Sequence, residues 1–365
     1  MNKQFFITMS KVVGVVLSLY FFLVGIKGLS SGIKHLGGDF ANEIMTTTSD
    51  PFLALFIGVL ATTLFQSSST TTSIIVGMVS GGAVTLTGAI PMIMGANIGT
   101  TVTNTIVSIG HISRGNEFKR AFAASTVHDF FNILAVLILF PLEMAFGIIE
   151  KTAIGLGTLL FGTISTNEVF NSPIKTAIKW GAKYIESLSF DNNGIFILLS
   201  VLLTFMMLYS IVKLLRSLVL DNIKQYFDKY IFKTALRAIL FGMVLTIMVQ
   251  SSSITTSTIV PLAGAGIVTL RQLYPFTLGA NLGTTVTALL ASLTLNVTAM
   301  VAAFAHLFFN IFGILIIYLN PLLKDIPIKL AEWMSEVSIK NKFIPIIYLL
   351  TFFFVLPFLI IIIGR

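Results

Sequence analysis

Two stretches of this sequence, FQSSSTTTSIIVG at 65–77 and VQSSSITTSTIVP at 249–261, carry the same run of glutamine and hydroxyl side chains between apolar segments. When the sequence is shifted by 184 residues, Gln66 falls on Gln250 and the three serines that follow coincide. Polar side chains of this kind are costly to bury unless they are hydrogen-bonded. A polar run that recurs in apolar surroundings therefore indicates two halves of a site.

The duplication extends beyond these two motifs. Between 66–105 and 250–289, 22 of the 40 aligned positions are identical, with no gap. The pair GANIGTT (95–101) and GANLGTT (279–285) has the same offset of 184 residues, and after a gap VHDFFN (127–132) resembles AHLFFN (305–310) at an offset of 178. A constant offset over separate motifs indicates an internal duplication.

The composition is that of a membrane protein. Of the 365 residues, 55% are hydrophobic and 10% are charged, and the mean hydropathy is +0.95. A bilayer span needs about 20 mostly apolar residues. The stretches that meet this requirement are 12–26 with its flanks, 193–212, 297–319 and 344–363. The sequence predicts an all-α polytopic membrane protein, built as two inverted repeats with re-entrant hairpins or broken helices.

The predicted organisation has five parts. They are an N-terminal helix with its connection (1–50), repeat 1 (51–164), a polar loop between the repeats (165–192), repeat 2 (193–319), and a connector with a C-terminal transmembrane helix (320–365). Inversion of the repeats requires an odd number of membrane crossings between equivalent points, which the sequence leaves open.

The net charge of +8 favours loops that set the topology over a nucleic-acid surface. The basic residues lie in short segments between apolar runs, as in 111–120, 213–237 and 340–342, which is the placement of the positive-inside rule. Lys3 and Lys11 predict a cytoplasmic N-terminus and a first helix that is retained rather than cleaved. Zero cysteines exclude disulfides and thiolate metal sites.

The apolar arms around each polar run are too short to cross a bilayer. In the first copy they are 51–65 and 73–86, and in the second 236–249 and 259–270. Non-helical backbone at membrane depth survives only in protein or beside water, so the polar tips are expected to line a cavity. Hydroxyls, amides and helix N-termini bind oxyanions, and the same uncharged oxygens suit sodium.

The other repeated segments add polar side chains to this site. Asn97, Thr100 and Thr101 in the first copy, with their partners in GANLGTT, can offer oxygen ligands, although small residues in membrane helices also serve close packing. Histidine and asparagine four residues apart share a helix face, which favours helix-to-helix hydrogen bonds over substrate contact. Asp129 occurs in one repeat only, and it indicates a cation site, a proton relay or an ion pair with Lys119 or Arg120.

The doubled QSSS motif, with a Gly-Ala-Asn-(Ile/Leu)-Gly-Thr segment in each copy and RAFAASTVHDFFN at 120–132, resembles the type II sodium-dependent phosphate cotransporters over roughly residues 50–320. The resemblance implies a symporter of divalent phosphate with sodium in the plasma membrane of a cell (the inner membrane of a bacterium), without a cofactor. It also implies inverted repeats and cytoplasmic termini, with a homodimer left open. The aspartate at position 129 implies electrogenic transport. The chain lacks the large cysteine-bearing loop of the vertebrate pattern, and we expect no C-terminal regulatory tail.

The resemblance assigns the motif residues to roles by position. The residues expected to bind phosphate are Gln66, Ser67, Ser68, Ser69, Gln250, Ser251, Ser252 and Ser253. Those expected to bind sodium are Thr71, Thr72, Asn97, Thr100, Thr101, Asp129, Thr255, Thr256, Asn281, Thr284 and Thr285. A supporting role is expected for His128, Asn132, His306 and Asn310.

Three other functions share parts of this evidence. A symporter of another small oxyanion or a dicarboxylate would use the same hydroxyl groups. A channel would need no coupling to sodium. An intramembrane serine hydrolase would need a QSSS serine within reach of His128 or His306, but duplication of three serines is unexpected for one nucleophile. No enzymatic activity is therefore predicted.

Overall fold

The computed structural model describes residues 3–35, 38–162, 173–223 and 231–364, and these residues form helices and short connections. Five segments are long and apolar enough to cross a membrane: Phe5–His35, Asn116–Phe146, Asn193–Leu218, Val297–Tyr318 and Ile344–Ile363. The predicted spans at 12–26, 193–212, 297–319 and 344–363 are confirmed as helices of this kind. The segment 116–146 is a further span of this kind, although charged residues in its first half interrupt the apolar pattern.

The first half of the chain contains α1 (Lys3–His35), α2 (Gly38–Ser49), α3 (Pro51–Phe65), α4 (Ser68–Gly81), α5 (Leu86–Gly99), α6 (Val102–Ile109), α7 (Asn116–Phe146), α8 (Ile148–Phe161) and α9 (Pro173–Ser187). The second half contains α10 (Asn193–Ile223), a 3-10 turn (Ile231–Lys233), α11 (Ala235–Val249), α12 (Ser252–Gly264), α13 (Leu270–Ser292) and α14 (Val297–Gly313), which continues as a π-helical stretch (Ile314–Tyr318). The last helices are α15 (Ile326–Lys340) and α16 (Ile344–Leu350), which a π-helical stretch (Thr351–Val355) joins to α17 (Leu356–Ile363).

The QSSS motifs interrupt their helices in the same way in both copies. Gln66 ends α3 with φ 52° and Gln250 ends α11 with φ 57°, a left-handed conformation that is uncommon for a residue with a side chain. Ser67 and Ser251 are then extended, with φ −153° and −155°, and their hydroxyls cap the next helix. The predicted broken helices are confirmed.

The polar tip is shorter than the sequence suggested. The helix resumes at Ser68 in α4 and at Ser252 in α12, so only two residues in each copy leave the helical conformation. Most of the hydroxyl side chains therefore lie on the first two turns of a helix, because the serine caps allow the chain to re-enter a helix at once.

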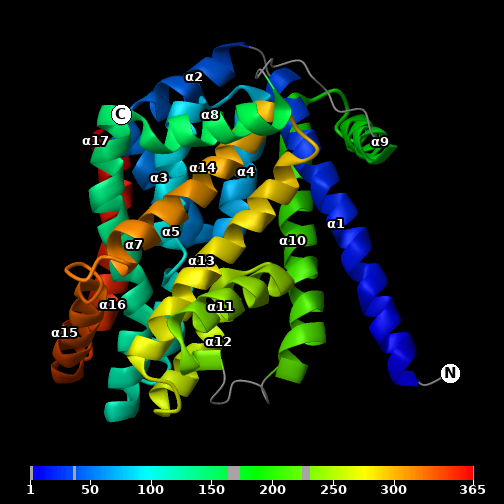
Figure 1. The fold of residues 1–365 in the computed structure, drawn as a ribbon. Helices are drawn as coiled ribbons and strands as arrows, with labels where there is room; N and C mark the ends of the chain where they lie inside the picture. Colours follow the sequence, from blue (N-terminus) through cyan, green and yellow to red (C-terminus); the bar gives the residue numbers. More distant parts are fainter. Residues whose placement is uncertain (1–2, 36–37, 163–172, 224–230, 365) are drawn as a thin grey trace.

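The arms α3 and α4 form a re-entrant hairpin. Near the end of α4, a methyl group placed on Gly81 would meet Ser30 and Ile33, close to the end of α1. After the turn that follows α4, Gly88 packs against Thr48, just before α3 begins. The hairpin therefore begins and ends at the same end of the bundle (Figure 1).

The packing of the hairpin arms recurs at the offset of 184 residues. A methyl group on Gly95 would overlap the carbonyl of Leu55, and one on Gly279 would overlap the carbonyl of Ile239. The same holds for Gly58 with Met92 and for Gly242 with Phe276. Helices α3 and α5, and α11 and α13, thus approach each other with backbone in contact, as small residues allow in membranes.

Helices α1 and α10 lie side by side and run in opposite directions (Figure 1). Gly14 on α1 packs against Leu214, Gly25 packs against Ser200 and Thr204, and Gly32 packs against Phe196 and Ile197. The partner's number falls as the glycine's number rises, which defines an antiparallel pair.

The segment 165–192, predicted as a polar loop between repeats, contains helix α9; its residues up to 172 lie outside the described part of the chain. Figure 1 places the two termini at opposite ends of the bundle. The expectation that both termini are cytoplasmic stays a prediction.

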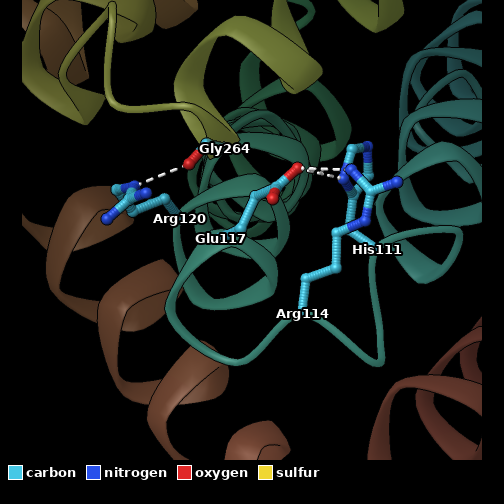
Figure 2. Close-up of polar contacts among 5 residues, drawn as sticks. All are labelled: His111, Arg114, Glu117, Arg120 and Gly264. Atoms are coloured by element: carbon cyan, nitrogen blue, oxygen red, sulfur yellow. Dashed lines mark hydrogen bonds and ion pairs between the residues drawn. The ribbon is translucent and has the colours of Figure 1, made fainter.

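The polar segment 111–120 connects the start of α7 to the end of α12, the second arm of the hairpin formed by α11 and α12. Figure 2 shows Arg120 donating from Nε to the Gly264 carbonyl at 2.7 Å, at the C-terminal end of α12. Glu117 turns the other way and accepts hydrogen bonds from His111 Nδ1 at 2.8 Å and Arg114 Nη1 at 2.9 Å. A cation at a helix C-terminus is favourable for that helix.

Candidate functional site

The two QSSS motifs, far apart in sequence, meet in the centre of the fold. The Ser69 hydroxyl donates to the carbonyl of Gln250 at 3.4 Å, which joins the first helix break to the second. In the reverse direction, the Ser253 hydroxyl donates to the carbonyl of Thr100 at 3.3 Å. The tips of the two broken helices therefore face one another, as the duplicated pattern led us to expect.

Many hydroxyls of the motifs donate back to their own helix. Thr72 Oγ1 donates to the Ser68 carbonyl at 2.8 Å, and Thr256 Oγ1 donates to the Ser252 carbonyl at 2.8 Å. Thr71 and Thr255 do the same to the carbonyls of the capping serines. A hydroxyl that donates its hydrogen bond to the backbone keeps oxygen lone pairs that can accept a hydrogen bond or ligate a cation.

Ser68 and Ser252 differ from these residues. They occupy the first position of α4 and α12, and they are 3% and 2% exposed. Among the described residues, neither hydroxyl has a hydrogen-bond partner. The site therefore has one free buried hydroxyl at each of two helix N-termini, where unpaired N–H groups and the helix dipole favour an anion.

The two glutamines are not equivalent. Gln250 Nε2 donates to the Ile247 carbonyl at 2.6 Å, and its Oε1 accepts from Thr287 at 2.9 Å. Both Gln250 and Thr287 also line a cavity of about 250 Å³ between α1, α10, α11 and α13. The Gln66 side chain is exposed and lies outside the buried cluster.

A network of asparagines and a histidine joins α5, α7 and α13. His128 Nε2 lies 2.7 Å from Asn281 Oδ1, and it donates because an amide oxygen can only accept. Asn281 Nδ2 donates to Asn132 Oδ1 at 2.8 Å, and Asn132 Nδ2 donates to the Asn97 carbonyl at 2.7 Å. His128 and Asn132 thus make helix-to-helix hydrogen bonds, which was the favoured interpretation. Both of these residues bond to the side chain of Asn281.

The equivalent residues of the second repeat form no such network. His306 is fully buried, and neither of its ring nitrogens has a hydrogen-bond partner among the described residues. Asn310 donates only to the His306 carbonyl, at 3.2 Å, and its Oδ1 has no partner there either. The Asn97 side chain, which corresponds to Asn281, donates to the Ile93 carbonyl of its own helix at 2.9 Å.

Asp129 is fully buried within α7 and makes no ion pair with Lys119 or Arg120. The ion-pair alternative is wrong, because Lys119 binds Glu336 at 2.9 Å and Arg120 binds Gly264. The Asp129 Oδ2 atom accepts from Tyr348 at 3.0 Å and from Thr105 at 3.5 Å, while Oδ1 has no partner among the described residues.

Thr101 completes the surroundings of this carboxylate. Its side chain lies close to Asp129, and its hydroxyl donates to the Ile98 carbonyl at 2.9 Å. The other predicted threonines, Thr100, Thr284 and Thr285, are buried and donate to carbonyls of their own helix. Sequence reasoning missed Tyr348, which lies in α16 outside the duplication, where no repeated motif marks it.

The site as a whole offers neutral oxygen atoms and one carboxylate. The described residues contain no group of three or more histidine, cysteine, aspartate or glutamate side chains that could hold a transition metal. Neutral oxygens with a single carboxylate favour hard monovalent or divalent cations over soft metals. The fold and the site define a multi-pass membrane protein with a central polar site formed by two broken helices.

Comparison with known proteins gives the family. The Na+/Pi-cotransporter family matches residues 21–165 and 202–318, and this chain belongs to that family of transporters rather than to an enzyme family. Its two matched segments begin on α1 and on α10.

Among curated relatives, the chain is 35% identical to the sodium-dependent phosphate transport protein 2B of Homo sapiens, over 93% of this chain and 63% of the relative. It is 34% identical to protein 2B of Pongo abelii, with the same coverage. It is 34% identical to protein 2A of Rattus norvegicus, over 94% of this chain and 66% of the relative. The chain thus spans slightly less than two thirds of these relatives. No solved structure matches the chain.

Proposed function

We propose that this protein imports inorganic phosphate together with sodium ions by alternating access. The observation that carries the proposal is the pair of free buried hydroxyls, Ser68 and Ser252, at the start of two half-helices whose tips are in contact. Family membership and relatives that are named sodium-dependent phosphate transporters support the choice of substrate.

Phosphate would be bound without a basic side chain. A divalent oxyanion needs several donors, and each half-helix offers backbone N–H groups together with the serine hydroxyls. Of the residues expected to bind phosphate, Ser69 and Ser253 already bridge the two repeats. Gln250 is positioned beside them, and the exposed Gln66 would have to turn inward to take part.

Sodium would be bound near Asp129. This carboxylate is surrounded by the hydroxyls of Thr101, Thr105 and Tyr348, and one of its oxygens lacks a partner among the described residues. A buried carboxylate is expensive in a membrane and is usually retained for an ion or proton pathway. The threonines of both repeats that donate to carbonyls of their own helix keep oxygen lone pairs that could also ligate sodium. We infer electrogenic transport, with more positive than negative charge moved inward per cycle.

Alternating access would follow from inversion of the two repeats. The antiparallel α1 and α10, and the repeated packing of α3 on α5 and of α11 on α13, support this arrangement. The closed network around Asn281 has an open counterpart at His306 and Asn310. In the opposite state we expect the second network to close on Asn97 while the first opens.

The protein would work in the plasma membrane. In Figure 1 the start of α1, the start of α7 and the end of α10 lie at one end of the bundle, and this end carries the basic segments around 111–120 and 213–223. From the positive-inside rule we infer that this end, and with it the N-terminus, is cytoplasmic. A homodimer stays a prediction.

The test is uptake of labelled phosphate into liposomes that contain the purified protein, with and without an inward sodium gradient. We expect uptake to require sodium. Equal uptake after replacement of sodium by choline would contradict symport. Competition by sulfate, arsenate and small dicarboxylates in the same assay tests the alternative substrates. If one of them inhibits the uptake of labelled phosphate more strongly than unlabelled phosphate does, that anion and not phosphate is the preferred substrate.

A further inference from the structure

Helix α9 lies against the outer side of α1, away from the central site (Figure 1). Tyr20 donates from its hydroxyl to the Ala177 carbonyl at 3.0 Å, and Gly181 packs against Val24. His35 at the end of α1 lies 3.2 Å from Glu186. The helix is therefore held along the second half of α1, from the middle of that span to its end.

The two faces of α9 differ in character. Its buried face carries Ile178, Gly181 and Ala182. On the opposite side, Trp180 and Tyr184 are 69% and 58% exposed, and their rings stack at a centroid distance of 6.3 Å. Exposed tryptophan and tyrosine beside a span are typical of the headgroup region, and a basic amphipathic helix of this kind lies in the interface plane.

Four lysines gather where α9 meets α1. Lys27 lies within electrostatic range of Lys34, Lys175 and Lys179. Among the described residues, Lys27, Lys34 and Lys179 make no ion pair. Burial also lowers the pKa of Lys175, because its amine loses water as a partner. Lys34 and Lys179 each repel Lys27, and an anion beside these lysines would reduce the repulsion.

An apolar cavity opens beside this lysine cluster. It has a volume of about 530 Å³ and lies between α1, α9 and the connection from α13 to α14. Its walls include Leu19, Leu23, Leu293 and Val297, and Lys175 is the charged residue among the residues that line it. The Lys175 Nζ atom lies 3.5 Å from the Leu295 carbonyl. The cavity thus joins an apolar volume to a positive rim.

We propose that this cavity binds a phospholipid with an anionic headgroup, whose phosphate lies among Lys27, Lys175 and Lys179 and whose acyl chain fills the apolar volume. Free phosphate would satisfy the lysines, but it would leave the apolar walls of a cavity in the ligand-sized range of about 300–1,000 Å³ without a partner. The exposed aromatic pair on α9 places the rim at the depth of lipid headgroups. This inference is independent of the transported substrate.

The test is native mass spectrometry of the full chain, purified in detergent and titrated with phosphatidylglycerol or with phosphatidylcholine. We expect preferential retention of phosphatidylglycerol. The double variant Lys175→Gln/Lys179→Gln should weaken it about tenfold or more, since each lysine near an anionic surface contributes a factor of about five. Lys183→Gln removes the same charge from the same helix outside the cluster and should retain the lipid.

A second variant addresses the cavity itself. Leu293→Trp fills the apolar volume and keeps every lysine, and we expect it to reduce phosphatidylglycerol binding in protein that elutes as a single species on gel filtration. Equal binding of both lipids to the unmodified chain, or equal loss in Lys183→Gln and the double variant, would overturn the proposal. Displacement of the lipid by millimolar inorganic phosphate would also overturn it, because the site would then be one for the free anion.

Discussion

The network around Asn281 predicts that two equivalent asparagines differ in their contribution to stability. Asn281 bonds to His128 and to Asn132, which lie on another helix of the other repeat, at 2.7 and 2.8 Å. The Asn97 side chain bonds only to the Ile93 carbonyl of its own helix. We therefore expect Asn281→Ala to destabilise the fold more than Asn97→Ala does.

The magnitude follows from the bonds that each variant loses. An interhelical side-chain hydrogen bond in a membrane contributes about 0.6 kcal/mol on average and up to about 1.7 kcal/mol. Asn281→Ala removes two of them and leaves buried groups of His128 and Asn132 without partners, which adds to the loss. The gain in helix propensity from alanine is the same in both variants and cancels. The difference between them should be about 1 to 3 kcal/mol.

The measurement is the reversible unfolding of both variants in mixed detergent micelles, followed by circular dichroism as denaturing detergent is added. Sodium-free buffer removes any contribution from bound ions. We expect a lower midpoint for Asn281→Ala and a nearly unchanged midpoint for Asn97→Ala. Equal midpoints, or a lower one for Asn97→Ala, would refute the reasoning, because the network would then not hold the two repeats in this arrangement.

Three further predictions concern the site and its frame. Asp129→Gly should retain sodium-driven phosphate uptake and lose the phosphate-induced current, and a current of unchanged size under voltage clamp would contradict the charge assignment. Ser68→Ala should weaken phosphate affinity about 10- to 100-fold, the value of a hydrogen bond to a charged group, whereas Ser73→Ala, whose hydroxyl bonds to its own helix, should change the apparent KM for uptake much less. Gly95→Ala forces a methyl group against a buried carbonyl and should destabilise the protein by about 1 to 3 kcal/mol, while the same change at Gly155, which has open space, should leave the melting temperature unchanged or higher.

The parts of the site that the sequence could predict are those that the duplication marks twice. A constant offset of 184 residues identified QSSS and GAN, and an offset of 178 identified the histidine–asparagine pair. The structure brings Ser69 to Gln250 and His128 to Asn281. The repeat also extends back into α3 and α11, where three small residues recur at a spacing of four, as in Gly58 and Gly242. That signal was weak, because three matches in fifteen positions do not rise above chance unless the shared helix face is known.

What the sequence could not predict depends on asymmetry. Tyr348 reaches Asp129 from a helix that has no counterpart in the duplication. Asn281 bonds to another helix and Asn97 bonds to its own helix, because only one of the two equivalent networks has formed. The two repeats have similar sequences at these positions, so the sequence cannot indicate which network forms. The alternative of an ion pair for Asp129 is wrong because Lys119 and Arg120 lie more than two helical turns away on the same helix and bind partners at its polar end.

The contacts within each hairpin differ from the contacts between the repeats, and this difference indicates which parts of the protein move together during transport. The arms α3 with α5, and α11 with α13, are joined by backbone contacts at Gly58, Gly95, Gly242 and Gly279, which tolerate no shift. The contacts between the repeats are instead made by side chains: hydrogen bonds of 3.3 to 3.4 Å at Ser69 and Ser253, the Thr256–Asn104 and Arg120–Gly264 bonds, and the asparagine network. Side-chain contacts can exchange partners more readily than backbone in contact, so we expect each hairpin to move with its supporting helix as one body. An ion or anion that bridges the tips acts on the contacts between the repeats, so a difference in its affinity for two arrangements of the repeats can change the conformation.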